Sequence, residues 1–220
     1  MKPAGKMLWV ALFAVAFALV ESSVVVYLRA LYYPAGFSFP LRLMEIAHLG
    51  VELGREIATM VMLVAIGVIA GGRPWERFGY FLIAFGAWDI LYYFWLWVLL
   101  GWPRSLLEWD VLFLIPVPWI GPVLAPLLIS AMMIGIGAAI TLRIHRGRAF
   151  LPGRASWAVA LLGTAVILFS FTSDTGATLQ GRMPEPYAYW QLVVGLLLYG
   201  LGFRLALREE PSGAGVNRRG

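Results

Sequence analysis

The sequence predicts an all-α integral membrane protein, built as a polytopic bundle of about six transmembrane helices. Of its 220 residues, 61% are hydrophobic and only 13% are charged, whereas about a quarter of the residues of an average soluble domain are charged. The mean hydropathy is +0.81. Long apolar stretches alternate with short polar loops, so we expect a single transmembrane helical domain over residues 1–207.

A hydrocarbon core of about 30 Å requires about 20 helical residues. We therefore expect spans at about 7–28, 44–70, 79–101, 121–142, 156–172 and 188–207. Three prolines, at 116, 118 and 122, each remove a backbone donor, so residues 105–120 should form a re-entrant or interfacial segment before the fourth span. Residues 208–220 are rich in glycine and charge and are expected to form a disordered cytoplasmic tail.

The distribution of Lys and Arg predicts the orientation, because these residues are enriched in cytoplasmic loops. Of the 17 basic residues, only Arg29, Arg42, Arg104 and Arg182 would lie outside if both termini are cytoplasmic, and Arg55 would lie within the membrane. We therefore expect a multi-pass protein of a bacterial-type inner membrane with both termini in the cytoplasm. The basic residues are not interleaved with stacking aromatics, which argues against nucleic-acid binding.

The second span has one strongly polar face. At about 100° per residue, a single arc of roughly 100° contains Glu45, His48, Glu52, Arg55, Glu56 and Thr59. A charge in mid-membrane costs about 2.5–3.5 kcal/mol on insertion scales, so this face should point into the bundle. Gly50, Gly54 and Ala58 repeat every four residues on another arc and predict close approach by a second helix.

Acidic residues of two other spans extend this polar face into a predicted pocket. Glu21 interrupts the first span, and Asp89 interrupts the third, beside two tyrosines. We predict an outward-facing acidic intramembrane pocket formed by Glu21, Glu52, Arg55, Glu56, Asp89, Tyr92 and Tyr93, with Glu45, His48 and Asp110 at its mouth. Its surplus negative charge must be neutralised by protons, by a bound cation or by basic groups elsewhere, of which Arg29 is the nearest in the chain.

Several interpretations of the pocket remain open. Glu45 and His48 match half of the Glu-x-x-His motif of di-iron and di-manganese bundles, so a divalent metal could be bound by Glu45, His48, Glu52 and Glu56. Such a metal could serve a membrane-embedded metalloenzyme acting on a lipid-borne substrate. The acids could instead mark a proton or ion pathway. In a structural or accessory subunit, the charges would only fix helix packing, with Arg55 paired to Glu52 and Glu56.

Other cofactors are excluded by composition and position. The chain has no cysteine, which excludes an iron–sulfur cluster. His48 and His145 lie near opposite membrane faces, so they cannot ligate one haem. No lysine lies in a predicted span, which excludes a retinal Schiff base. The expected partners are the lipid bilayer and either a membrane-protein partner or further copies of the chain.

Parts of the sequence resemble a group of bacterial multi-span integral membrane proteins with no assigned activity. The resemblance is carried by the stretches VELGREIATMVML, FGAWDILYYFWLWVLLGWP and LEWDVLFLIPVPWIGPV. It covers roughly residues 21–130. It implies no function, so function must follow from the residues themselves.

Overall fold

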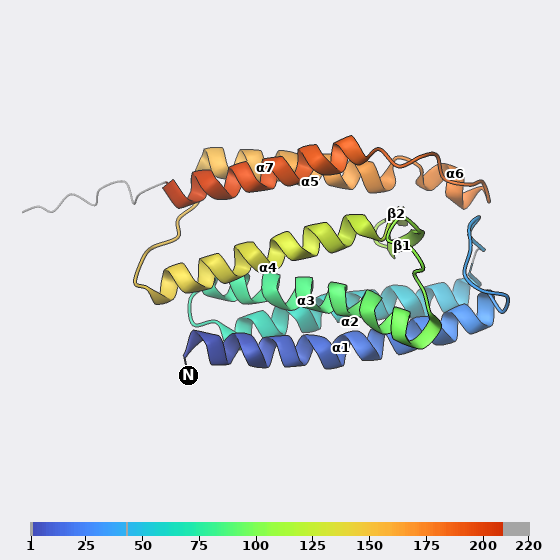
Figure 1. The fold of residues 1–220 in the computed structure, drawn as a ribbon, viewed down its shortest axis with the longest axis horizontal. Coiled ribbons are helices and arrows are strands. Elements are labelled where there is room, and N and C mark those ends of the chain that lie inside the picture. The colour runs from blue at the N-terminus through green and yellow to red at the C-terminus, as the bar shows by residue number, and fades with distance from the viewer. Residues whose placement is uncertain (1, 43, 209–220) are drawn as a thin grey trace, which may run out of the picture.

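The structure, a computed structural model that describes residues 2–42 and 44–208, is a bundle of long helices (Figure 1). The helices are α1 (Pro3–Tyr32), α2 (Ile46–Ala70), α3 (Pro74–Leu100), α4 (Leu124–His145), α5 (Arg154–Thr172), α6 (Thr175–Leu179) and α7 (Tyr189–Arg208). All of them except α6 are long and apolar enough to cross a membrane. The predicted all-α bundle with six spans is therefore confirmed. The predicted tail beyond Arg208 lies outside the described residues.

α1 and α3 begin four and five residues, respectively, before the predicted spans. Both α1 and α3 start at a proline, Pro3 and Pro74. Proline favours the first helical turn because its φ is already helical and its missing donor would be unpaired there in any case. α3 ends at Gly101, whose φ of 65° is left-handed, a conformation that glycine adopts without steric penalty.

The helices form two groups (Figure 1). α3 packs against α1, α2 and α4, whereas α5 packs mainly against α7. The start of α1 and the end of α7 lie at the same end of the bundle. We call this the basic end, because it carries Lys2, Lys6, Arg73, Arg77, Arg143, Arg146, Arg148, Arg154, Arg204 and Arg208.

Glycines allow α3 and α4 to approach closely. A Cβ added to Gly137 would lie 2.5 Å from the Gly79 carbonyl oxygen, and one added to Gly86 would lie 2.4 Å from the Ser130 carbonyl oxygen. Both distances are shorter than any ordinary contact, so a side chain at either position would force the helices apart. The α3–α4 contact is therefore a backbone-to-backbone packing of small residues.

The prediction that another helix packs against Gly50, Gly54 and Ala58 is wrong. Apart from the adjoining backbone of α2 itself, no described atom lies within 4 Å of a Cβ built at Gly50 or Gly54, and Ala58 is exposed. These residues lie opposite the polar face of α2, and because that face points inward, they lie on the outside of the bundle. The close contact of α2 is made instead by Gly67, where a Cβ would lie 2.8 Å from the Arg77 carbonyl oxygen.

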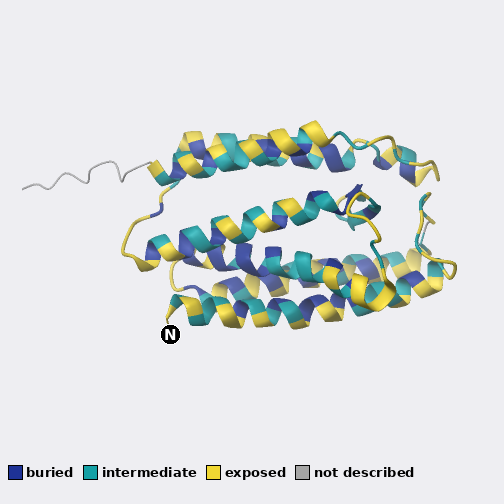
Figure 2. Ribbon diagram, in the orientation of Figure 1, coloured by how far each residue is buried: buried dark blue, intermediate teal, exposed yellow. Residues whose placement is uncertain are grey.

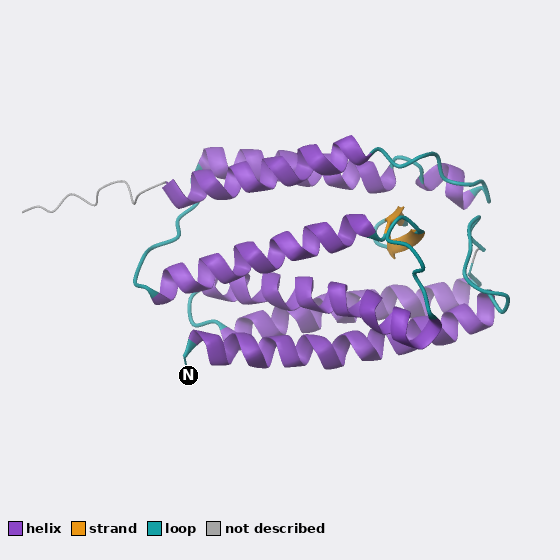
Figure 3. Ribbon diagram, viewed as in Figure 1, coloured by secondary structure: helices purple, strands orange, loops and turns teal. Residues whose placement is uncertain are grey.

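The proline-rich segment before α4 contains an antiparallel β-hairpin, which the sequence did not predict (Figure 3). Its strands are β1 (Trp109–Phe113) and β2 (Trp119–Pro122), with Val111 paired to Ile120. Two of the prolines lie between the strands, and the third ends β2, so none of them interrupts the interior of a strand. The hairpin lies at the end of the bundle opposite the basic end, which we call the hairpin end.

The hairpin also links the two groups of helices. Trp119 of β2 stacks on Phe171 of α5 with ring centroids 6.3 Å apart, and Tyr187, just before α7, packs into the same cluster. Exposed residues, coloured yellow on the ribbon in Figure 2, occur along all of the long helices, and many of them are large apolar residues. Such a surface suits contact with lipid acyl chains, in which apolar side chains need no further burial.

Candidate functional site

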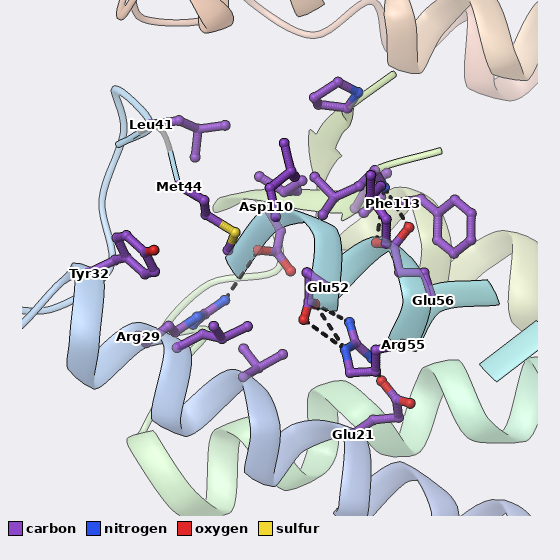
Figure 4. A pocket seen from close by; sticks show the side chains of 18 of the residues that line it. Glu21, Arg29, Tyr32, Leu41, Met44, Glu52, Arg55, Glu56, Asp110 and Phe113 are labelled. Carbon is purple, nitrogen blue, oxygen red and sulfur yellow. Dashed lines mark hydrogen bonds and ion pairs between the residues drawn. The ribbon is translucent and has the colours of Figure 1, made fainter. Parts of the chain in front are cut away.

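A cavity of about 530 Å³ lies at the hairpin end, between α1, α2, α3 and the hairpin (Figure 4). The sequence predicts that acids from three helices meet here, and the structure brings all of the predicted pocket residues to this cavity. Its ionisable and tyrosine lining includes Glu21, Arg29, Glu52, Arg55, Glu56, Asp89, Tyr92, Tyr93 and Asp110. We call this space the acidic cavity.

Helical periodicity places the polar face of α2 in the cavity wall. Glu52, Glu56 and Thr59 are 6%, 6% and 1% exposed, respectively, whereas the side chain of Glu45 is 79% exposed. His48 is also exposed and contacts the hydroxyl of Tyr32, with 2.6 Å between Nδ1 and the oxygen. Glu45 immediately precedes α2, and His48 lies in its first turn. Both predicted mouth residues are exposed to solvent, and neither lines the cavity.

Arg55 joins α2 to α1 (Figure 4). Its guanidinium contacts Glu21 of α1 through Nη1 and Glu52 of α2 through Nη2, and its Nε lies 2.9 Å from Glu52 Oε1. Thr59 donates a hydrogen bond of 2.5 Å to Glu21. The predicted pairing of Arg55 with Glu56 is wrong, because Arg55 reaches towards α1, whereas Glu56 points to the hairpin.

A second ion pair joins α1 to the hairpin. Arg29 Nη2 lies 3.2 Å from Asp110 Oδ1, and the two residues are only 8% and 3% exposed. The guanidinium carbon of Arg29 also lies 3.7 Å from the ring centroid of Trp102 and 4.2 Å from that of Phe37. Sequence reasoning placed Asp110 at the mouth of the pocket and named Arg29 as the nearest basic group that could neutralise the acids. It did not pair the two residues, because it did not predict the hairpin that brings them together.

The environment of Asp110 shifts its proton affinity. Burial raises the pKa of the Asp110 carboxyl to about 6, and the neighbouring Arg29 guanidinium opposes that rise. Asp110 belongs to β1, outside the long helices. The group is therefore ionised at neutral pH largely because its cation is held beside it.

Two carboxylates of the acidic cavity have only neutral hydrogen-bond donors. Glu56 accepts the backbone N–H of Leu114 at 3.0 Å, and Asp89 accepts the hydroxyl of Ser130 at 2.8 Å. Within residues 2–42 and 44–208, no Lys, Arg or His nitrogen lies within 4 Å of either carboxylate. The lining of the cavity thus has five carboxyl groups and three guanidinium groups, those of Arg29, Arg42 and Arg55, with a formal charge of −2 if all are ionised.

Aromatic rings complete the wall. Trp88, Tyr92 and Tyr93 of α3 follow one another around it, with ring centroids 6.3 Å apart for the first pair and 5.0 Å apart for the second. The indole nitrogen of Trp88 and the Nη1 atom of Arg29 are buried and have no hydrogen-bond partner in the described chain. Ring faces beside unpaired carboxylates favour a bound cation, because both attract positive charge.

The predicted divalent-metal set does not assemble. In the described part of the chain, no group of three or more His, Asp or Glu side chains is arranged to hold a metal ion. His48 and Glu45 approach each other to 4.0 Å, but at the exposed start of α2. Glu52 is bound by Arg55, and Glu56 by the hairpin, so these four donors do not converge on one point.

The acidic cavity is closed towards the basic end by an apolar core. One helical turn closer to the basic end than Glu21 and Thr59, Phe17 of α1 and Leu63 of α2 belong to a buried cluster with Tyr80 and Ile83 of α3. Near the basic end, Glu76 of α3 is held by Lys6 at 3.5 Å and His145 at 3.1 Å. This arrangement resembles a closed pocket more than the predicted proton or ion pathway.

Comparison with known proteins gives no further assignment. A scan of family models, a search of curated proteins and a search of solved structures found no match to this chain. The resemblance to uncharacterised bacterial membrane proteins therefore stays a prediction.

Proposed function

We propose that this integral membrane protein binds a small organic cation, an amine or quaternary ammonium, in the acidic cavity. The observation that carries the proposal is the placement of Glu56 and Asp89. Glu56 is buried and Asp89 is half-buried; both carboxylates line the cavity, and both are hydrogen-bonded only by neutral donors. Unpaired carboxylates in an apolar layer are costly, so a cation that enters the cavity would be held by the charge that it neutralises.

The size and lining of the acidic cavity favour an organic cation over a bare ion. Sites for small molecules have volumes of about 300–1,000 Å³, and this cavity measures about 530 Å³. A metal ion would leave most of that volume unfilled, and the described residues offer it no converging set of ligands. An ammonium group with apolar substituents would place its charge near Glu56 and Asp89 and its alkyl groups against Trp88 and Tyr92.

Binding of tetraethylammonium to the detergent-purified protein tests the proposal. The titration is followed by tryptophan fluorescence at constant ionic strength, with sodium chloride as the reference salt. Glu56→Gln and Asp89→Asn each remove one attractive charge, and we expect each to weaken binding by about tenfold, equivalent to about 1.4 kcal/mol. The control is Glu45→Gln, which removes an exposed carboxylate just before α2. This variant should bind tetraethylammonium as tightly as the wild type does.

Two outcomes would contradict the proposal. The first is that neither tetraethylammonium nor a primary amine such as butylammonium binds, in which case protons alone neutralise the carboxyl groups. The second is that Glu56→Gln and Asp89→Asn bind as tightly as Glu45→Gln. Size-exclusion profiles of all variants show whether a loss of binding reflects a loss of folding.

A structural or accessory subunit is the second candidate function. It is favoured by the two ion pairs, because Arg55 links α1 to α2 and Arg29 links α1 to β1. In that case the charges would hold the helices in register, and the cavity would bind no ligand. A protein of this kind should co-purify with a partner chain, and Glu56→Gln should leave that complex intact.

We also propose that the basic end faces the cytoplasm of a bacterial-type inner membrane. The clustering of basic residues at one end supports this orientation by the positive-inside rule. The acidic cavity would then open towards the outer side, where a cationic solute is accessible to it.

A further inference from the structure

A second cavity separates the two groups of helices. It measures about 310 Å³ and lies between α3 and α4 on one side and α5 and α7 on the other. We call it the lateral groove, and its walls include Leu82, Met133, Ile136, Ala160 and Phe203. It shares no lining residue with the acidic cavity.

The lateral groove is apolar and opens onto the lipid-facing surface. Phe78 and Leu161 line it and are 41% and 61% exposed, respectively. The hydroxyl groups of Thr164 and Tyr199 also line it, but they lie 2.8 Å apart and hydrogen-bond to each other. An apolar ligand in the groove would therefore leave this pair of hydroxyls satisfied.

The groove extends to an aromatic cluster at the basic end. The ring of Trp75 lies 5.2 Å from that of Phe150 and 6.0 Å from that of Trp157, centroid to centroid, and all three residues line the groove. Tryptophan is enriched where the hydrocarbon core meets the headgroups. This position places the mouth of the groove at the headgroup level.

Two exposed arginines lie next to residues of that mouth in the chain. Arg148 and Arg154 lie on either side of Phe150 and Pro152 in the chain, and both arginines are exposed. Within residues 2–42 and 44–208, neither guanidinium lies within 4 Å of a carboxylate. Arg143, by contrast, is occupied by the carbonyl oxygens of Ala149 and Leu207, which tie the loop to α7.

We propose that the lateral groove binds one anionic phospholipid of the bilayer, with an acyl chain between α4 and the α5–α7 pair. The phosphate is bound by Arg148 and Arg154, because unpaired basic groups at the membrane surface attract anionic headgroups. The apolar walls match the acyl chain, and the opening between exposed apolar side chains admits it from the bilayer. This site is independent of the proposed cation site.

Lipid selectivity of the reconstituted protein tests this inference. Spin-labelled phosphatidylglycerol and phosphatidylcholine are compared in the same vesicles, and the motionally restricted fraction gives the preference for each. We expect phosphatidylglycerol to be preferred, and Arg148→Gln and Arg154→Gln each to lower that preference by about fivefold. Arg182→Gln removes an exposed arginine near the hairpin end and should leave the preference unchanged.

A second pair of variants tests the groove itself. Ala160→Phe fills the groove and should reduce the restricted fraction of both lipids, whereas Ala158→Phe, on the exposed side of α5, should not. The inference is overturned if Arg182→Gln lowers the preference as much as Arg148→Gln, or if a co-purifying membrane protein occupies the groove in place of lipid. Should Ala160→Phe fail to fold, the exposed arginine variants alone decide the outcome.

Discussion

The buried Arg29–Asp110 pair makes the strongest prediction for stability. Both residues are almost fully buried, with 3.2 Å between Nη2 and Oδ1. Removing one partner of such a pair costs about 3–5 kcal/mol, because the other is left as an uncompensated buried charge. An exposed ion pair would contribute only about 0–1 kcal/mol. We therefore expect Asp110→Asn and Arg29→Met each to lower the free energy of unfolding by about 3–5 kcal/mol.

The two variants should differ in their dependence on pH. The pKa of Asp110 is about 6 in the folded protein, compared with about 3.9 in an unfolded chain. In Arg29→Met the cation that opposes this rise is absent, so the pKa of Asp110 rises further. A carboxyl that binds its proton more tightly when folded stabilises the fold at low pH and loses that contribution as the pH rises.

The assay is unfolding by sodium dodecyl sulfate in mixed micelles, followed by tryptophan fluorescence at pH 5 and pH 8. Relative to the wild type, Arg29→Met should be more destabilised at pH 8 than at pH 5. The loss in Asp110→Asn should instead be smaller at pH 8 than at pH 5, because the wild type loses the stabilising contribution of the Asp110 proton over this range, whereas Asn has no proton to lose. The double variant Arg29→Met/Asp110→Asn should lose less free energy of unfolding than the sum of the losses of the two single variants. Additivity within about 0.5 kcal/mol would mean that the residues are uncoupled, which would refute the reasoning.

Two further predictions concern helix packing and orientation. Gly137→Ala should destabilise the protein by about 1–3 kcal/mol in the same assay, because its Cβ would lie 2.5 Å from the Gly79 oxygen. The control is Gly135→Ala, whose Cβ would have no described atom within 4 Å beyond the adjoining helix backbone. Equal losses in the two variants would contradict the close α3–α4 contact. The chain has no cysteine, so Ser38→Cys at the hairpin end should react with a membrane-impermeant maleimide on intact cells, and Ala149→Cys at the basic end should not. The opposite labelling would reverse the proposed orientation.

The sequence by itself determined the membrane class, the helical fold and the polar face of α2. These properties depend on hydropathy over about 20 residues and on the helical repeat, which are both local. For the same reason, the periodicity that placed Glu52, Glu56 and Thr59 on one face also identified the side chains that the structure buries.

The tertiary structure alone decided what those side chains meet. Arg55 binds Glu21 because α1 lies beside it, and Arg29 binds Asp110 because the hairpin folds back over the bundle. Periodicity also predicted a packing face at Gly50, but close helix approach occurs at Gly67 and Gly137. A local pattern gives the direction in which a side chain points, whereas its partner comes from a segment distant in the chain whose position depends on the packing of the whole bundle.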